Sequence, residues 1–211
     1  RSVQHNKFDW ADAKRIHEKS IELNPNYPNA HEWYSAHLVG SGNFAEGIKE
    51  IERAEELDPL SLRTKTLVAW TKCQAHQFDE ALAKAEEIID LDQHFPQGHL
   101  QKGYALMELG RGAEALAEIE KAIVLMPESA LLKFNLACAF AAANRQPDAR
   151  KVFDEMKADA KKGYVKPMFL GYAAVAAGEI NEAFVYFNQA ADEFDPWLVW
   201  LGTDLKLETI R

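Results

Sequence analysis

Apolar and polar residues alternate with helical spacing along most of the chain. In residues 113–125, apolar side chains recur every three or four positions and so share one face of a helix. Residues 97–109 contain no helix breaker other than two glycines. Gly110 separates the two stretches and Pro127 follows the second, and both residue types end helices. The pattern predicts two helices joined by a tight turn.

This helix pair recurs with a period of 34 residues. Pro25 and Pro59 are 34 positions apart, and Pro127 stands twice that distance further on. One small residue appears once in each period, in the series Ala13, Gly47, Ala81, Ala115, Ala149 and Ala183. A second small series is Ser35, Ala69, Gly103, Ala137 and Gly171. Only small side chains let two helix backbones approach closely, so both series mark helix crossings. The sequence therefore predicts an all-α solenoid of stacked helix pairs.

The period, the small series and the prolines together resemble the tetratricopeptide repeat (TPR) family, whose pattern is W-x2-L-G-x2-Y, A-x3-F and P over 34 residues. The resemblance covers nearly the whole chain. It implies a right-handed superhelix of about five and a half helix-turn-helix repeats. The expected divisions are a half repeat at 1–27, repeats at 28–61, 62–95, 96–129, 130–163 and 164–195, and a capping helix at 196–211.

The first helix of each repeat departs from the family pattern. Where the family places Trp, the chain has His31, Lys65, His99, Lys133 and Pro167. We expect the lysine stems to pack along the surface while their ammonium groups stay in water. The histidines are expected to be polar surface groups or partly packed rings.

A narrower resemblance concerns particular phrases. FDWADAKRIHEKSIELNPNY near the start and DPWLVWLGTD near the end resemble the carboxyl-terminal repeat arrays of bacterial multidomain regulators. In those proteins the array follows a winged-helix DNA-binding, nucleotide-cyclase or protein-kinase domain. This similarity implies an alternative function, as the sensory or regulatory module of a longer bacterial signalling chain. The ending LKLETIR departs from that group.

Composition narrows the classes of partner. The chain has 211 residues, and 24 Lys and Arg against 33 Asp and Glu give 24 − 33 = −9, which argues against a nucleic acid partner. The longest apolar run has eight residues (LACAFAAA), well below the roughly 18 that span a membrane. Cys73 and Cys138 fall in different repeats, so we expect free thiols and a cytoplasmic location. No membrane partner is predicted.

The sequence contains no recognisable catalytic or metal-binding motif. The seven histidines form no HExxH pattern, and no Cys pair has zinc spacing. The glycine-containing phrases GSGNF and LGRGAE lack the Lys-Ser/Thr of a phosphate loop and fall at turns between helices. We therefore predict no enzyme activity and no cofactor.

One stripe of each first helix is the candidate binding surface. Positions 2, 5, 9 and 12 of a repeat share a helix face, and in the TPR family that face lines a concave groove where peptides bind. From the third repeat onward this stripe is apolar and aromatic, and a second apolar face must be covered by something. The candidate partner-binding residues are Arg63, Thr66, Trp70, Leu100, Tyr104, Met107, Leu131, Phe134, Cys138, Met168, Tyr172 and Val175.

The stripe also limits the kind of partner. The best-known groove of the family holds a terminal carboxylate with Lys and Asn at positions 5 and 9, and no repeat here has that pair. An aromatic groove instead suits an amphipathic helix or apolar segment of another protein. Two alternatives stay open. The end of the chain, through Trp197, Trp200 and Leu201, can fold over the last repeat and cover part of the stripe, and an exposed groove can pair two copies as a homodimer. The sequence predicts a protein-interaction scaffold.

Overall fold

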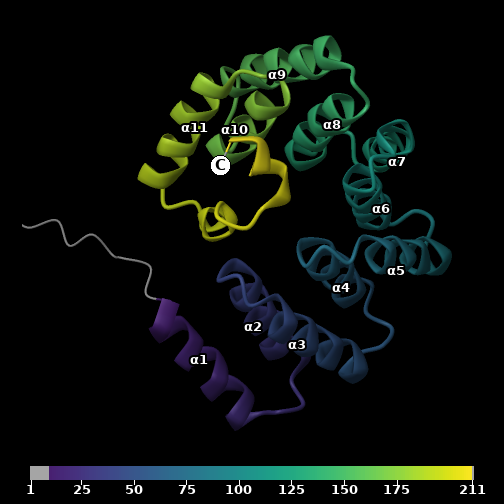
Figure 1. Ribbon diagram of the computed structural model, residues 1–211, viewed down its shortest axis with the longest axis vertical. Coiled ribbons are helices and arrows are strands. Elements are labelled where there is room, and N and C mark those ends of the chain that lie inside the picture. Colours follow the sequence, from purple (N-terminus) through teal and green to yellow (C-terminus); the bar gives the residue numbers. More distant parts are fainter. Residues whose placement is uncertain (1–9, 211) are drawn as a thin grey trace, which may run out of the picture.

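A computed structural model describes the backbone of residues 10–210 and the side chains of residues 10–207. In this part of the chain it contains eleven α-helices and no strand (Figure 1). The helices are α1 (Trp10–Leu23), α2 (Pro28–Gly40), α3 (Phe44–Leu57), α4 (Leu62–Gln74), α5 (Phe78–Leu91), α6 (Pro96–Glu108), α7 (Gly112–Leu125), α8 (Ala130–Ala142), α9 (Gln146–Ala160), α10 (Pro167–Ala176) and α11 (Ile180–Asp192). The prediction of an all-α solenoid is confirmed. Residues 1–9 of the expected half repeat lie outside the described residues.

The described helices form five complete pairs after α1. The first helices α2, α4, α6 and α8 begin at the residues where the sequence places the repeat starts. The fifth first helix begins at Pro167 rather than at residue 164. The reason is that α9 continues to Ala160 and is followed by a turn, in which the N–H of Gly163 donates to the carbonyl of Asp159 at 3.0 Å.

The turn inside each repeat has the same backbone conformation. Gly42, Gly110 and Gly178 have φ of +80°, +73° and +78°, respectively. His76 (φ +60°) and Asn144 (φ +59°) adopt the same left-handed conformation at the equivalent positions. Glycine adopts it at little steric cost because it lacks a Cβ atom. These turns end the first helix of each repeat in the same way.

The small series lie where the helices of a pair cross. A Cβ atom on Gly103 would lie 2.7 Å from Ile119 Cδ1. A Cβ atom on Gly171 would lie 2.3 Å from the ring of Phe187. Ala115, from the other series, is completely buried. Larger side chains at these positions would push the two helices apart.

Lys65, at the family's Trp position, does not place its ammonium group in water. Its Nζ lies 2.8 Å from Glu55 Oε1 and 2.5 Å from Glu87 Oε1. Lys84 Nζ reaches the same two carboxylates, at 2.9 Å from Glu55 and 2.5 Å from Glu87. Burial opposes the ionisation of Glu55, but the two lysines together outweigh it and hold the pKa of Glu55 below its usual value. The expectation of a solvated head is wrong for Lys65, because acids from α3 and α5 surround it.

Histidines replace the family's Trp in the first and third repeats. His31 Nδ1 lies 2.6 Å from Glu50 Oε2, and its Nε2 lies 3.0 Å from the carbonyl oxygen of Pro25. His99 repeats this arrangement, with Nδ1 2.7 Å from Glu118 Oε2 and Nε2 3.0 Å from the backbone oxygen six residues earlier. Both rings are buried, and each ties its helix to the partner helix of the repeat and to the preceding loop.

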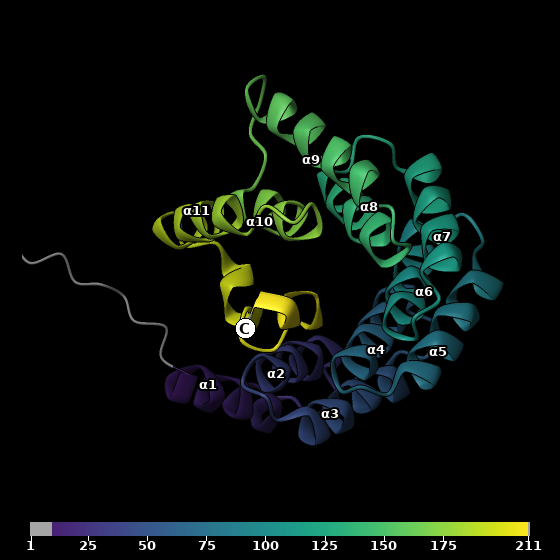
Figure 2. The same ribbon diagram turned by 45° about the horizontal axis from the view of Figure 1, so that its top comes forward.

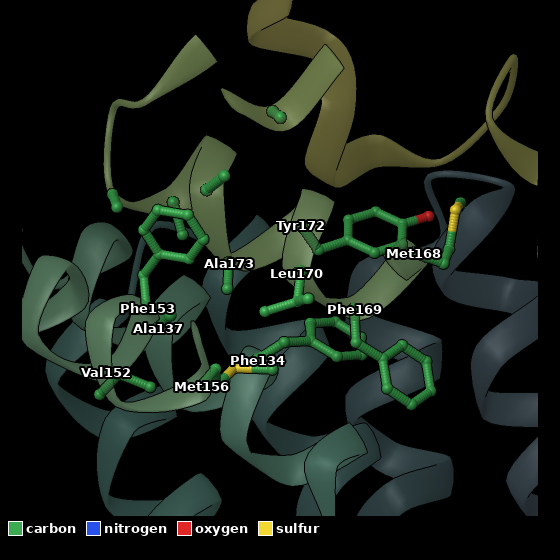
Figure 3. Close-up of a cluster of buried hydrophobic side chains, with 14 of the residues drawn as sticks. Phe134, Ala137, Val152, Phe153, Met156, Met168, Phe169, Leu170, Tyr172 and Ala173 are labelled. Atoms are coloured by element: carbon green, nitrogen blue, oxygen red, sulfur yellow. The ribbon is translucent and has the colours of Figure 1, made fainter. Parts of the chain in front are cut away.

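The largest apolar core lies between α8 and α11 (Figure 3). Phe134 of α8 has its ring centroid 5.1 Å from that of Phe169 of α10. The ring of Tyr172 stacks on Phe134, also at 5.1 Å. Phe153 and Met156 of α9 belong to the same cluster. This core joins the last two repeats into one block, so the C-terminal half of the array is its most apolar part.

The chain after α11 does not form the expected capping helix. Phe194 (φ +55°) ends α11 in a left-handed conformation, and the N–H of Trp197 then donates to Asp195 Oδ1 at 2.9 Å. Two short 3-10 helices follow, η1 (Pro196–Trp200) and η2 (Leu205–Ile210). Figures 1 and 2 show them in yellow inside the arc formed by the repeats. The prediction of a cap at 196–211 is wrong because the turn at Phe194 directs the chain into this hollow, where Leu205 and Leu207 are buried and Trp197 and Trp200 are half-buried.

Candidate interaction groove

The first helix of each repeat lies on the inner side of the arc (Figure 2). Among the residues predicted to line the groove, Leu100, Tyr104, Phe134, Met168 and Tyr172 are buried. Thr66, Trp70, Met107, Leu131, Cys138 and Val175 are half-buried, and Arg63 is exposed. We call this surface the concave groove. Tyr104, Phe134 and Tyr172 are thus covered and Trp70 is partly covered, although all four lie on helices that face the hollow.

Residues 196–207, which we call the C-terminal segment, cover much of the concave groove. Trp200 packs against Trp70 in a T-shaped arrangement, with ring centroids 5.5 Å apart. Its Nε1–H donates to the carbonyl of Ala36 on α2 at 3.3 Å. The ring of Trp197 lies 6.0 Å from that of Trp200 and 5.2 Å from that of Phe169 on α10. The two tryptophans therefore connect the first two repeats with the last one.

A polar cluster holds the end of the C-terminal segment. The hydroxyl of Tyr172 donates to Asp204 Oδ2 at 2.7 Å, and both side chains are buried. Lys206 Nζ lies 4.0 Å from the centroid of the Tyr104 ring and 3.6 Å from Asp204 Oδ1. A cation above an aromatic face is attracted by the negative potential of the ring. Burial disfavours the charge on Lys206, but Asp204 and neighbouring groups together outweigh it, so the pKa of Lys206 lies above its usual value.

The two cysteines lie beneath this cluster as free thiols. Burial raises the pKa of both Cys73 and Cys138 to about 12, and the nearby charge of Lys206 only partly opposes this effect. Since the thiolate is the reactive form, burial favours the unreactive thiol at both positions.

The polar candidates at the N-terminal side of the groove have other partners. Arg63 forms an ion pair with the buried carboxylate of Glu32. The hydroxyl of Thr66 donates to the carbonyl of Leu62 at 2.8 Å. These two residues bind neighbouring repeats and their own helix, whereas the aromatic candidates face the C-terminal segment.

Part of the concave groove remains open beside the C-terminal segment. A cleft of about 350 Å³ lies between the ends of α6, α8 and α10 on one side and residues of η2 on the other. Its walls include Met107, Glu108, Cys138, Val175, Leu205 and Lys206. The C-terminal segment thus extends further than the sequence suggests, from the last repeat to the first, without filling the hollow.

Sequence reasoning missed two members of this site. Asp204 and Lys206 follow a Gly-Thr pair outside the period, so no repeat position identifies them as groove residues. The nearest signal is the alternation of Leu205 and Leu207 with these charged residues, which is typical of a segment with one buried and one polar side.

Comparison with known families agrees with this architecture. Residues 69–130 and 100–163 match the family model of the tetratricopeptide repeat. Residues 69–163 carry TPR repeats. A segment of 117 residues is 31% identical to the Hsp70-Hsp90 organizing protein of Triticum aestivum, covering 53% of this chain and 20% of that protein. The chain therefore corresponds to about a fifth of the length of this relative.

Solved TPR structures have the same fold. A tetratricopeptide repeat protein from Parabacteroides merdae matches with a TM-score of 0.69 at 12% identity, over 87% of this chain and 72% of that one. A thermophilic TPR protein from Thermus thermophilus matches with a TM-score of 0.64 at 16% identity, over 86% and 90% of the two chains. At these identities the likeness concerns the fold alone.

Other sequence-based predictions concern chemistry and context. Among the residues that the structure describes, no group of three or more His, Cys, Asp and Glu side chains could hold a metal ion. In the same part of the chain, no helix is both long and apolar enough to cross a membrane. The relation of this TPR array to bacterial multidomain regulators remains a prediction from sequence phrases.

Proposed function

We propose that this TPR array is a protein-interaction scaffold whose concave groove binds an apolar segment of a partner, and that the C-terminal segment occupies the groove until the partner displaces it. The observation that carries the proposal is the packing of Trp200 against Trp70 and Ala36. The groove already holds a segment of the composition that its lining favours.

The chemistry of this intramolecular occupant indicates what a partner needs. Trp200 and Trp197 supply aromatic anchors, a residue type enriched at the energetic centres of interfaces. Asp204 accepts a hydrogen bond from Tyr172, and Lys206 lies over the ring of Tyr104. These two charged residues therefore fix the orientation of the segment, which apolar contacts alone do not. A partner segment with a Trp followed by an acidic and a basic residue fits the same contacts.

The wheat relative is named as an organizer of Hsp70 and Hsp90. The groove of this chain favours a different ligand chemistry. The Lys and Asn that hold a terminal carboxylate in the family's best-known groove are replaced, for example by Leu100 and Tyr104 in the third repeat. Two uncharged, buried side chains supply apolar contact in place of a carboxylate clamp.

The test uses a labelled peptide with the sequence of residues 195–207. Trp200→Ala in the full chain removes the anchor on Trp70 and should loosen the chain's own segment, which proteolysis near residue 200 would detect. We expect the peptide to bind this variant at least tenfold more tightly than the wild-type chain, because loss of an interfacial Trp anchor costs about 2 kcal/mol or more.

A second variant places the binding in the groove. Adding Tyr104→Ala to Trp200→Ala should abolish the gain, because the peptide's Lys then loses its aromatic face. Trp33→Ala is the matched control, since Trp33 is exposed on α2 and belongs to no predicted groove position. The proposal is contradicted if the peptide does not bind a folded Trp200→Ala chain. It is also contradicted if Trp33→Ala, added to Trp200→Ala, lowers the affinity for the peptide as much as Tyr104→Ala does.

A further inference from the structure

Every repeat before the last has its second helix covered by the following repeat. α3, α5, α7 and α9 each pack against the first helix that comes next in the chain. The approach is close: a Cβ atom on Gly112 of α7 would lie 2.2 Å from the carbonyl oxygen of Ala142 at the end of α8. Gln146 of α9 likewise donates to the carbonyl of Ala176 at the end of α10, at 2.6 Å. The stacking face of a second helix is built to receive a helix.

Among the residues that the structure describes, no helix packs on the stacking face of α11 in this way. Phe184 stands two periods after Leu116, which is only 7% exposed, yet Phe184 is 49% exposed. The C-terminal segment follows α11 but turns into the hollow and leaves a cleft of about 320 Å³, which we call the terminal cleft. Its walls are Phe184, Phe187, Asn188 and Ala191 of α11 and Leu198, Leu201 and Leu207 of the C-terminal segment.

We propose that the terminal cleft binds an amphipathic α-helix of a partner protein, which takes the place of the first helix of a sixth repeat. The occupant follows from continuity with the four internal junctions, where the same helix face receives a helix of 10 to 13 residues in each case. Apolar side chains of the partner helix enter between Phe184 and Leu201. The α11 side of this binding surface lies outside the concave groove, whereas its other wall belongs to the C-terminal segment while that segment occupies the groove.

The internal junctions also show which polar residues border an incoming helix. There the first helix supplies lysines to acids of the second helix: Lys72 lies 3.0 Å from Glu52, and Lys102 lies 3.0 Å from Glu86. In α11 the equivalent position is Asn188, which lines the terminal cleft, and Glu182 already pairs with Lys157 of α9 at 3.2 Å. The apolar face of the partner helix therefore carries the binding, and a polar residue at its border would face the Asn188 amide.

The probe is a synthetic peptide with the sequence of residues 61–75, which contains α4 and the Ser61 cap. This helix packs on the stacking face of α3, carries three basic residues and offers Cys73 for a fluorescent label on the groove side. We expect saturable binding to the full wild-type chain by fluorescence anisotropy. Phe184→Glu should weaken binding at least tenfold, because a charge then lies in the apolar cleft.

Val185→Glu is the matched control. Val185 is the next residue on α11 and is 64% exposed, but it does not line the terminal cleft, so affinity should stay within twofold. Circular dichroism of both variants checks that the helices are intact. A peptide that is lost equally from both variants, or that does not bind the wild-type chain, overturns the proposal.

Two other outcomes identify a different occupant and also overturn it. If light scattering shows a wild-type dimer that Phe184→Glu converts to a monomer, the terminal cleft is an interface between copies of this chain. If binding of the peptide depends on Tyr104 and is insensitive to Phe184→Glu, the peptide occupies the concave groove. The groove proposal and the terminal-cleft proposal therefore fail by different measurements.

Discussion

Tyr172→Phe tests whether the C-terminal segment is held by the polar cluster. The substitution removes only the hydroxyl that donates to Asp204 Oδ2 at 2.7 Å, and both side chains are at least nine-tenths buried. A hydrogen bond to a charged group contributes about 1.5–3 kcal/mol. Since 1.36 kcal/mol corresponds to a factor of ten, the segment should open about 10- to 150-fold more often.

Hydrogen exchange measures this opening directly. The N–H groups of Thr203 and Asp204 both donate to the carbonyl of Trp200, at 2.9 and 2.8 Å, and should exchange faster by the same factor. Thiol labelling gives a second measurement, because Cys73 is buried in a cluster with Leu205, has its pKa raised to about 12 by burial and becomes reactive when the segment leaves.

Tyr164→Phe is the matched control for this prediction. Tyr164 also donates to a carboxylate, Glu193 Oε2 at 2.9 Å, but its side chain is 76% exposed. Its loss should change stability by less than about 0.5 kcal/mol. The reasoning is refuted if the two substitutions have equal effects, or if Tyr172→Phe leaves exchange at Thr203 unchanged.

Two further predictions concern the packing of the repeats. Gly171→Ala should lower the free energy of unfolding by about 1–3 kcal/mol in urea titration, because its Cβ would lie 2.3 Å from the Phe187 ring, while Gly163→Ala, with no atom within 4 Å, should have little effect. Burial lowers the pKa of His17 and of His37, so these residues bind protons more readily in the unfolded chain than in the folded one. The melting temperature should therefore fall as the pH drops below about 6.5. A variant with both histidines replaced by Phe should lose this part of the pH dependence of the melting temperature.

The repeat architecture could be predicted because its signals are local and recur. Gly103 and Gly171 each stand at a helix crossing, and the period alone identifies both. The partners of Lys65 could not be predicted, because Glu55 and Glu87 come from different helices and their approach depends on how the repeats stack. A sequence pattern specifies which face of a helix is polar, whereas the identity of an ion pair is set by the superhelix.

The C-terminal segment is the main difference between the sequence-based prediction and the structure. Trp197 and Trp200 have the apolar character of a capping helix, and they occur only once, so no equivalent repeat positions show where they pack. The decisive features are the left-handed Phe194 and the cap formed by Asp195, which are common in helix ends generally and do not indicate a direction. For this reason the sequence does not determine whether the C-terminal segment covers the groove.

The contacts that Trp197 and Trp200 make with helices far apart in the chain also have a mechanical consequence. A solenoid is elastic, since each repeat contacts only its neighbours and small rotations add up along the array. Here the C-terminal segment connects α2 to α10, through the hydrogen bond from Trp200 to the carbonyl of Ala36 and the ring contact of Trp197 with Phe169. If a ligand displaced these two contacts, the pitch of the superhelix would no longer be fixed. Binding at one point of the groove would then change the distance between the two ends of the repeat array.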